Sequence, residues 1–137
     1  IRAGFIRWHG LACTTHTELM DRRLLDYDLS ISQALDRRFG VTTLAAKMTD
    51  VPGHTIGLVP ALSDAGIEFL HIGVNASSRV PSVPSLFRWR FGGKEITVNY
   101  AAEYGSWSIC MPGWQRSIPR HISKRALLMN SRRKSGR

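Results

Sequence analysis

The feature that most constrains the fold is an alternation of strand-like and helix-like stretches in the middle of the chain. Residues 41–49 (VTTLAAKMT) and 67–75 (IEFLHIGVN) are short and apolar, as buried strands are. Between them, residues 55–66 (TIGLVPALSDAG) have helical apolar spacing and end at a glycine. Strand, helix and strand in this order predict a βαβ unit with a parallel sheet, and therefore an α/β fold.

The preceding stretch repeats this order. Residues 3–13 (AGFIRWHGLAC) are largely apolar and predict a buried strand. A helix is expected next, capped by Thr15 or Thr17 and ended by the pair Phe39–Gly40. Apolar residues recur there every three or four positions and predict one buried stripe: Met20, Leu24, Tyr27, Ile31 and Leu35.

The pattern changes after Asn75. Residues 76–85 are rich in Ser and Pro and predict a loop. Residues 86–100 (LFRWRFGGKEITVNY) alternate aromatic and basic residues before Gly92–Gly93, which predicts a β-hairpin with a two-residue turn. We expect this hairpin to be an insertion on the binding side of the sheet.

The net charge of +9 is concentrated at the C-terminal end of the chain. All ten acidic residues lie at or before Glu103, whereas eight of the 19 basic residues follow it. Residues 1–103 are therefore almost neutral, and we do not expect nucleic acid as their partner. We expect residues 1–113 to form the domain and residues 114–137 to be a basic tail that is disordered or foreign to it.

Several features bear on location. No apolar run approaches the roughly 20 residues of a membrane span, so no membrane partner is expected. The first residues contain neither an initiator Met nor a signal-peptide pattern, which suggests an internal piece of a longer protein. Cys13 and Cys110 are far apart and form no metal motif, so free thiols and a cytoplasmic location are favoured.

Polar residues recur at the carboxyl ends of all three predicted strands, where parallel α/β folds place their functional side chains. His16 and Glu18 follow the first strand, Asp50 and His54 follow the second, and Asn75 ends the third. This recurrence predicts a functional site.

Asp50 is the strongest candidate within that site. An aspartate directly after a strand can be a nucleophile, a metal ligand or the N-cap of the next helix. Pro52 and Gly53 would make the turn tight and allow other atoms to approach. On the hairpin, Trp89 and Phe91 either pack the strands together or offer a stacking face to a sugar.

Two stretches resemble the α-mannosidase-like glycoside hydrolases of family 38 and their relatives. MTDVPGHTIGLVPALSDAGIEFLHIG (48–73) is similar to the strand of that family that ends in an aspartate followed by Gly-His, and to the helix and strand after it. WHGLACTTHTELMD (8–21) resembles the strand before it. The resemblance covers about residues 4–100.

The resemblance implies an α/β fold that is a partial (β/α)7 barrel, here with the inserted hairpin. It implies retaining hydrolysis of a carbohydrate with a bound zinc ion, and Asp50 as both nucleophile and metal ligand. The polar strand ends and the hairpin would then contact the sugar through His16, Glu18, His54, Asn75 and Trp89.

The family's other zinc ligands and its general acid would lie outside this chain, so we expect the chain to be inactive by itself. A piece of a barrel also leaves an open sheet edge through which copies of the chain could associate. Two other functions stay open. One is a small nucleic-acid-binding protein that uses the basic tail, and the other is an inactive carbohydrate-binding remnant that uses Trp89 and Phe91.

Overall fold

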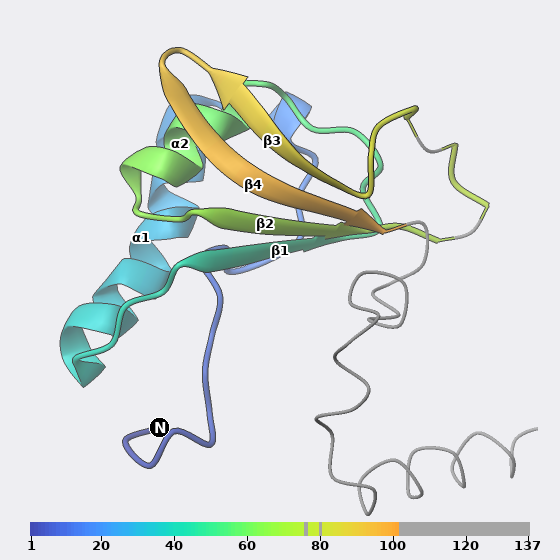
Figure 1. Cartoon of the computed structure of the whole chain (residues 1–137). Helices are drawn as coiled ribbons and strands as arrows, with labels where there is room; N and C mark the ends of the chain where they lie inside the picture. The colour runs from blue at the N-terminus through green and yellow to red at the C-terminus, as the bar shows by residue number, and fades with distance from the viewer. Residues whose placement is uncertain (76, 80, 102–137) are drawn as a thin grey trace, which may run out of the picture. The chain divides into compact units, whose positions relative to one another are not determined.

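The computed structural model describes residues 1–75, 77–79 and 81–101 (Figure 1). The expected boundary at residue 113 and the tail 114–137 lie outside the described residues. The elements, in chain order, are a short 3-10 helix at Thr17–Leu19, α1 at Arg22–Phe39, β1 at Ala45–Thr49, α2 at Leu58–Asp64, β2 at Phe69–Gly73, β3 at Leu86–Phe91 and β4 at Lys94–Ala101.

The four strands form one mixed sheet in the order β1-β2-β4-β3, which confirms the α/β class. β1, β2 and β4 are parallel, and only β3 runs antiparallel. β1, α2 and β2 form the expected βαβ unit, in which Pro60 lies in the first turn of α2, where it costs no helical hydrogen bond. Neither helix of the described part of the chain is long and apolar enough to span a membrane.

Both helices pack on the same face of the sheet, behind the strands in the view of Figure 1. The core between the helices and the sheet is apolar, and the pairing register aligns its strand residues in rows. One row is Ala46, Leu70 and Val98, and the next is Met48, Ile72 and Tyr100. The helices contribute Leu25, Leu29, Leu58 and Leu62.

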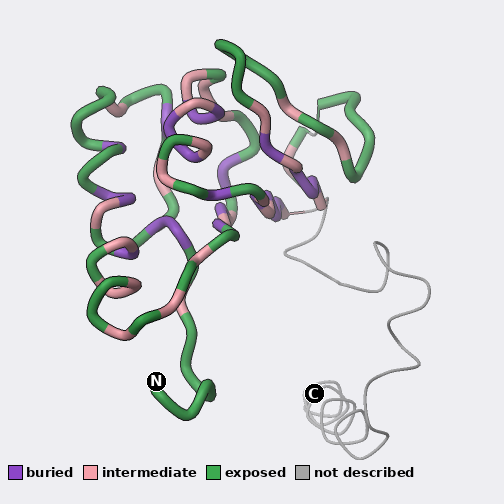
Figure 2. Tube along the Cα trace, turned by 60° about the vertical axis from the view of Figure 1, so that its left-hand side comes forward, coloured by how far each residue is buried: buried purple, intermediate pink, exposed green. Residues whose placement is uncertain are grey.

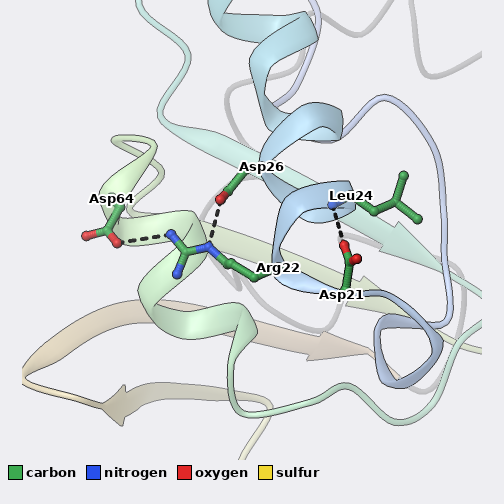
Figure 3. Close-up of polar contacts among 5 residues, drawn as sticks. All are labelled: Asp21, Arg22, Leu24, Asp26 and Asp64. Atoms are coloured by element: carbon green, nitrogen blue, oxygen red, sulfur yellow. Dashed lines mark hydrogen bonds and ion pairs between the residues drawn. The ribbon is translucent and has the colours of Figure 1, made fainter.

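Helix α1 begins and ends as local chemistry requires, although its cap is not the expected one. Asp21, rather than Thr15 or Thr17, is the N-cap, and its carboxylate accepts a 2.7 Å hydrogen bond from the Leu24 N–H (Figure 3). Gly40 ends the helix with a left-handed φ of 65°, which confirms the predicted stop. Arg22 joins α1 to α2 through an exposed ion pair with Asp64, also drawn in Figure 3.

The expected buried stripe of α1 is wrong. Leu24, Tyr27 and Ile31 are 51%, 67% and 39% exposed. The buried positions lie about 100° further round the helix, on the side that Figure 2 shows turned toward the rest of the described chain. They are Leu25, Asp28, Leu29 and Ser32. Two of these four are polar, so the apolar pattern of the sequence did not mark the buried face.

The two polar residues are buried because they bind the backbone of the N-terminal segment. Asp28 Oδ1 accepts a 3.0 Å hydrogen bond from the Ala12 N–H. Ser32 Oγ donates a 2.8 Å hydrogen bond to the Gly10 carbonyl. Both backbone groups lie within the segment that was expected to be the first strand.

Residues 3–13 form no strand, so that prediction is wrong. The segment lies beside β1, where the Gly10 N–H donates to the Ala45 carbonyl over 2.8 Å. No ladder develops, because the Ala12 N–H bonds to Asp28 instead. Further on, the Thr14 hydroxyl, rather than a backbone carbonyl, accepts a 3.1 Å hydrogen bond from the Thr49 N–H.

The hairpin forms as expected, but it is not an insertion. Gly92 and Gly93 have φ angles of 60° and 75°, which the tight turn between β3 and β4 requires. β4 also pairs with β2 in parallel, from Phe69↔Thr97 to Gly73↔Ala101, and is therefore an internal strand of the main sheet. Of the two hairpin strands, only β3 lies at an edge of the sheet.

Candidate functional site

The site begins where β1 and β2 end next to each other. The Asp50 N–H donates a 2.8 Å hydrogen bond to the Gly73 carbonyl. The side chains meet as well, because Asn75 Nδ2 donates to Asp50 Oδ1 over 3.2 Å. The structure thus brings together two residues that the sequence placed at the ends of neighbouring strands.

Asp50 has an uncommon backbone conformation. Its φ of 72° is the only positive φ of a non-glycine residue in the described part of the chain. This left-handed conformation costs most residues about 1 kcal/mol or more, although aspartate tolerates it better than most. Asp50 does not cap a helix, since the N-cap position of α2 belongs to Gly57. Asp50 is therefore a turn residue that follows β1, and its roles as nucleophile and metal ligand stay predictions.

His54 lies in the loop between Asp50 and α2 and is held by the segment before α1. Its Nδ1 is 3.2 Å from the hydroxyl of Thr17, a fully buried residue that also accepts a 3.0 Å hydrogen bond from the Thr55 N–H. Burial lowers the pKa of His54, nearby Glu18 opposes this effect, and His16 adds to it. The imidazole is therefore neutral at pH 7.

Glu18 and His16 are brought close to His54 by this packing. A Cβ atom built on Gly53 would lie 3.4 Å from Glu18 Oε1, so the carboxylate borders the backbone of the 51–57 loop. His16 and Glu18 belong to the turn that the short 3-10 helix forms, and both are exposed. His16 and Glu18 therefore form one polar region with His54, whereas the contacts of Asp50 are with Gly73 and Asn75.

Trp89 lies on β3, half-buried, and packs against the core. It also lines an open pocket of about 610 Å³ together with His54. Phe91, at the end of the same strand, is 47% exposed and does not line that pocket. Other members of the pocket were not anticipated, although Phe87 shares the two-residue period of Trp89 and could have been found from it.

A second group of polar side chains lies on the sheet face that neither helix covers. Lys47, His71 and Asn99 occupy matching positions on β1, β2 and β4. The ring nitrogen Nδ1 of His71 is 2.8 Å from Asn99 Oδ1, and Asn99 Nδ2 donates to the Ser85 carbonyl over 3.0 Å. His71 is therefore hydrogen-bonded on the sheet face opposite the two helices.

The described residues do not satisfy the ligand requirement of zinc. Across residues 1–75, 77–79 and 81–101, no three His, Cys, Asp or Glu side chains form a group that could hold a metal. A catalytic zinc normally takes three protein ligands. Asp50 and Asn75 provide one carboxylate and one amide. Zinc therefore stays a prediction from the family resemblance.

Comparisons with protein-family profiles, with curated proteins and with solved structures gave no match to this sequence.

Proposed function

We propose that this chain carries the nucleophile of a retaining glycoside hydrolase of the α-mannosidase-like kind, and that Asp50 is that nucleophile. The observation that carries the proposal is the placement of Asp50. It is an exposed carboxylate at the carboxyl end of a parallel strand, its backbone is held in a left-handed conformation, and Asn75 of the neighbouring strand end bonds to it. Costly backbone conformations cluster at functional sites.

The arrangement of layers is compatible with a segment of a (β/α)7 barrel. Within the described part of the chain, the three parallel strands have helices on one face only. In a barrel the opposite face would line the interior, where a polar row such as Lys47, His71 and Asn99 is suitable for a carbohydrate. In such a barrel Asp50, which follows β1, would lie at the rim of the interior.

In the proposed reaction a carboxylate oxygen of Asp50 attacks the anomeric carbon of the sugar. The bond from that carbon to the leaving oxygen breaks, the leaving group departs with the electron pair, and a covalent glycosyl ester forms. Asn75 orients the carboxylate through its hydrogen bond to Oδ1. Glu18 and His16, which lie beside His54 in the following loop, would bind sugar hydroxyls.

The experiment uses a substrate that needs no acid catalyst. The chain is expected to be inactive on ordinary glycosides, because the resemblance places the general acid outside it. The leaving group of a 2,4-dinitrophenyl α-mannoside departs as a stable anion without an acid, so its release by this chain would depend on the nucleophile. Dinitrophenolate release is followed by absorbance with and without added Zn²⁺, because the resemblance implies that ion.

The critical variant is Asp50→Asn, which removes the nucleophile and changes the side-chain volume little. We expect its rate to fall to that of the uncatalysed reaction. Asp26→Asn is the matched control, because Asp26 is an exposed aspartate of α1 whose partner is Arg22. Equal rates in the wild type and in Asp50→Asn would remove Asp50 from the mechanism.

A further inference from the structure

We propose that the pocket between the β3–β4 hairpin and the 51–57 loop binds a small aromatic carboxylate. This site is distinct from Asp50 and Asn75, neither of which lines the pocket. The inference does not depend on the proposed glycosidase function. The pocket has a volume of about 610 Å³, which lies within the range of roughly 300–1,000 Å³ that is typical of small-molecule sites.

The walls of the pocket are mostly apolar and aromatic. Phe87 and Trp89 project from alternate positions of β3, and Tyr100 and Ile72 lie on the adjoining strands of the same sheet face. A flat ring suits such walls, because aromatic side chains stack on ring faces or meet them edge-on. Sugar hydroxyls would find few partners on these walls, and unpaired polar groups cost binding energy.

The pocket is formed before any ligand arrives. The Tyr100 hydroxyl donates a 2.7 Å hydrogen bond to the Pro52 carbonyl, which fixes the 51–57 loop against the end of β4. His54 in the same loop is held by Thr17. A preformed pocket spends less binding energy on ordering its own walls.

Two polar groups give the pocket its ligand preference. His54 Nε2 is buried and has no hydrogen-bond partner within the described part of the chain, although buried polar atoms are normally paired. Arg79 lines the pocket, is exposed, and takes part in no ion pair among the described residues. No carboxylate side chain lines the pocket to neutralise this guanidinium.

The ligand chemistry follows from this combination. An aromatic ring would fill the space beside Trp89, and an anionic group would pair with the Arg79 guanidinium, which matches carboxylate geometry well. A polar atom of the ligand would satisfy His54 Nε2. A carboxylate on a single aromatic ring is the smallest ligand that offers both features.

The test uses benzoate with the full 137-residue chain labelled with ¹⁵N. We expect a Kd on the order of 1 mM, given the ligand's few atoms, and saturable amide shifts at residues 53–54 and 87–89. Benzamide has the same shape without the charge, and cyclohexanecarboxylate has the charge without the aromatic ring. Both should bind more weakly than benzoate.

Two variants locate the site. Arg79→Gln should weaken benzoate binding by about 3- to 10-fold and leave benzamide binding unchanged, because the loss is that of a charge-assisted pair. Arg23→Gln is the matched control, an exposed arginine of α1 outside the pocket. Trp89→Leu should weaken both aromatic ligands, provided that its spectrum shows the native fold.

The proposal is overturned if benzoate causes no saturable shifts at millimolar concentration, or if the shifts are confined to the arginine-rich residues 114–137. Equal weakening by Arg79→Gln and Arg23→Gln would also overturn it, because the effect would then come from overall charge. Arg79 is exposed, so Arg79→Gln is expected to fold. The test therefore stays decisive even if Trp89→Leu does not fold.

Discussion

Asn75 Nδ2 donates a hydrogen bond to Asp50 Oδ1 over 3.2 Å, and this contact joins the ends of two adjacent parallel strands. Asn75 is itself positioned, since its Oδ1 accepts hydrogen bonds from the N–H and the hydroxyl of Ser77. The orientation of Asp50 is therefore determined partly by the loop that follows β2.

The first prediction concerns this contact. Asn75→Ala should lower dinitrophenolate release by about 10-fold, because small losses of orientation at a reacting group have effects of this order. The free energy of unfolding should change little, because the two side chains meet at an exposed position. A rate equal to that of the wild type would show that Asn75 does not position Asp50.

The second prediction compares two adjacent leucines of α1. Leu25 is 4% exposed and Leu24 is 51% exposed. Leu25→Ala should cost about 2–5 kcal/mol of unfolding free energy, whereas Leu24→Ala should stay within about 0.5 kcal/mol. Urea denaturation of both variants measures the two values. A larger loss in Leu24→Ala would mean that the apolar stripe seen in the sequence is the buried face after all.

The third prediction concerns Asp36, which connects three parts of the chain. It accepts hydrogen bonds of 2.8 Å from the Trp8 indole, from the Thr43 N–H and from the Thr43 hydroxyl. Burial alone would raise the pKa of Asp36, but these hydrogen bonds outweigh it and lower the pKa below its usual value. Asp36→Asn should therefore cost about 1–3 kcal/mol at pH 7.

The pH dependence of that cost has a definite sign. Because the folded pKa of Asp36 is lowered, its contribution to stability is present above the unfolded pKa of about 4 and is lost as the pH falls through the folded value. The gap between wild type and Asp36→Asn should accordingly shrink as the pH falls below about 4. A gap that is constant between pH 7 and pH 3 would contradict this account.

The fourth prediction concerns Asp28, whose pKa is shifted in the opposite direction. Burial raises the pKa of Asp28, and the hydrogen bond from Ala12 and the charge of His9 only partly oppose it. Ionised Asp28 therefore reduces stability above its folded pKa, and this cost disappears as the pH falls toward its unfolded pKa. Asp28→Asn should be at least as stable as the wild type at pH 7.

Asp28→Ala provides the comparison, since it removes the acceptor of the Ala12 N–H and should cost about 1–3 kcal/mol. Urea denaturation at pH 7 measures both variants. If Asp28→Asn is as destabilised as Asp28→Ala, the prediction is contradicted. The negative charge of Asp28, rather than its role as acceptor of the Ala12 N–H, would then hold the N-terminal segment.

The βαβ unit and the hairpin could be predicted because local signals specify them. Short apolar runs bounded by turn residues mark β1, β2 and the two hairpin strands, and Gly92–Gly93 marks the turn. The first strand was predicted wrongly for a non-local reason. The Ala12 N–H bonds to Asp28, 16 residues away, and no local pattern reveals that contact.

The face of α1 illustrates the same limit. Five apolar residues at helical spacing indicated a buried stripe, yet Asp28 and Ser32 lie on the buried side because they bind backbone groups of residues 10–12. Among the candidate site residues, the sequence placed Asp50 and Asn75 at neighbouring strand ends, where the parallel register brings them together. The partnership of His54 with Thr17 depends on tertiary packing and could not be foreseen.

The central claim, that Asp50 is a nucleophile, is tested most directly by covalent trapping. The chain is incubated with a 2-deoxy-2-fluoroglycosyl fluoride, from which fluoride leaves as the carboxylate bonds to the anomeric carbon, and the digested protein is analysed by mass spectrometry. The account predicts one fluoroglycosyl group on the peptide that contains Asp50 and none in Asp50→Asn. Labelling of another residue, or equal labelling of the two proteins, would contradict it.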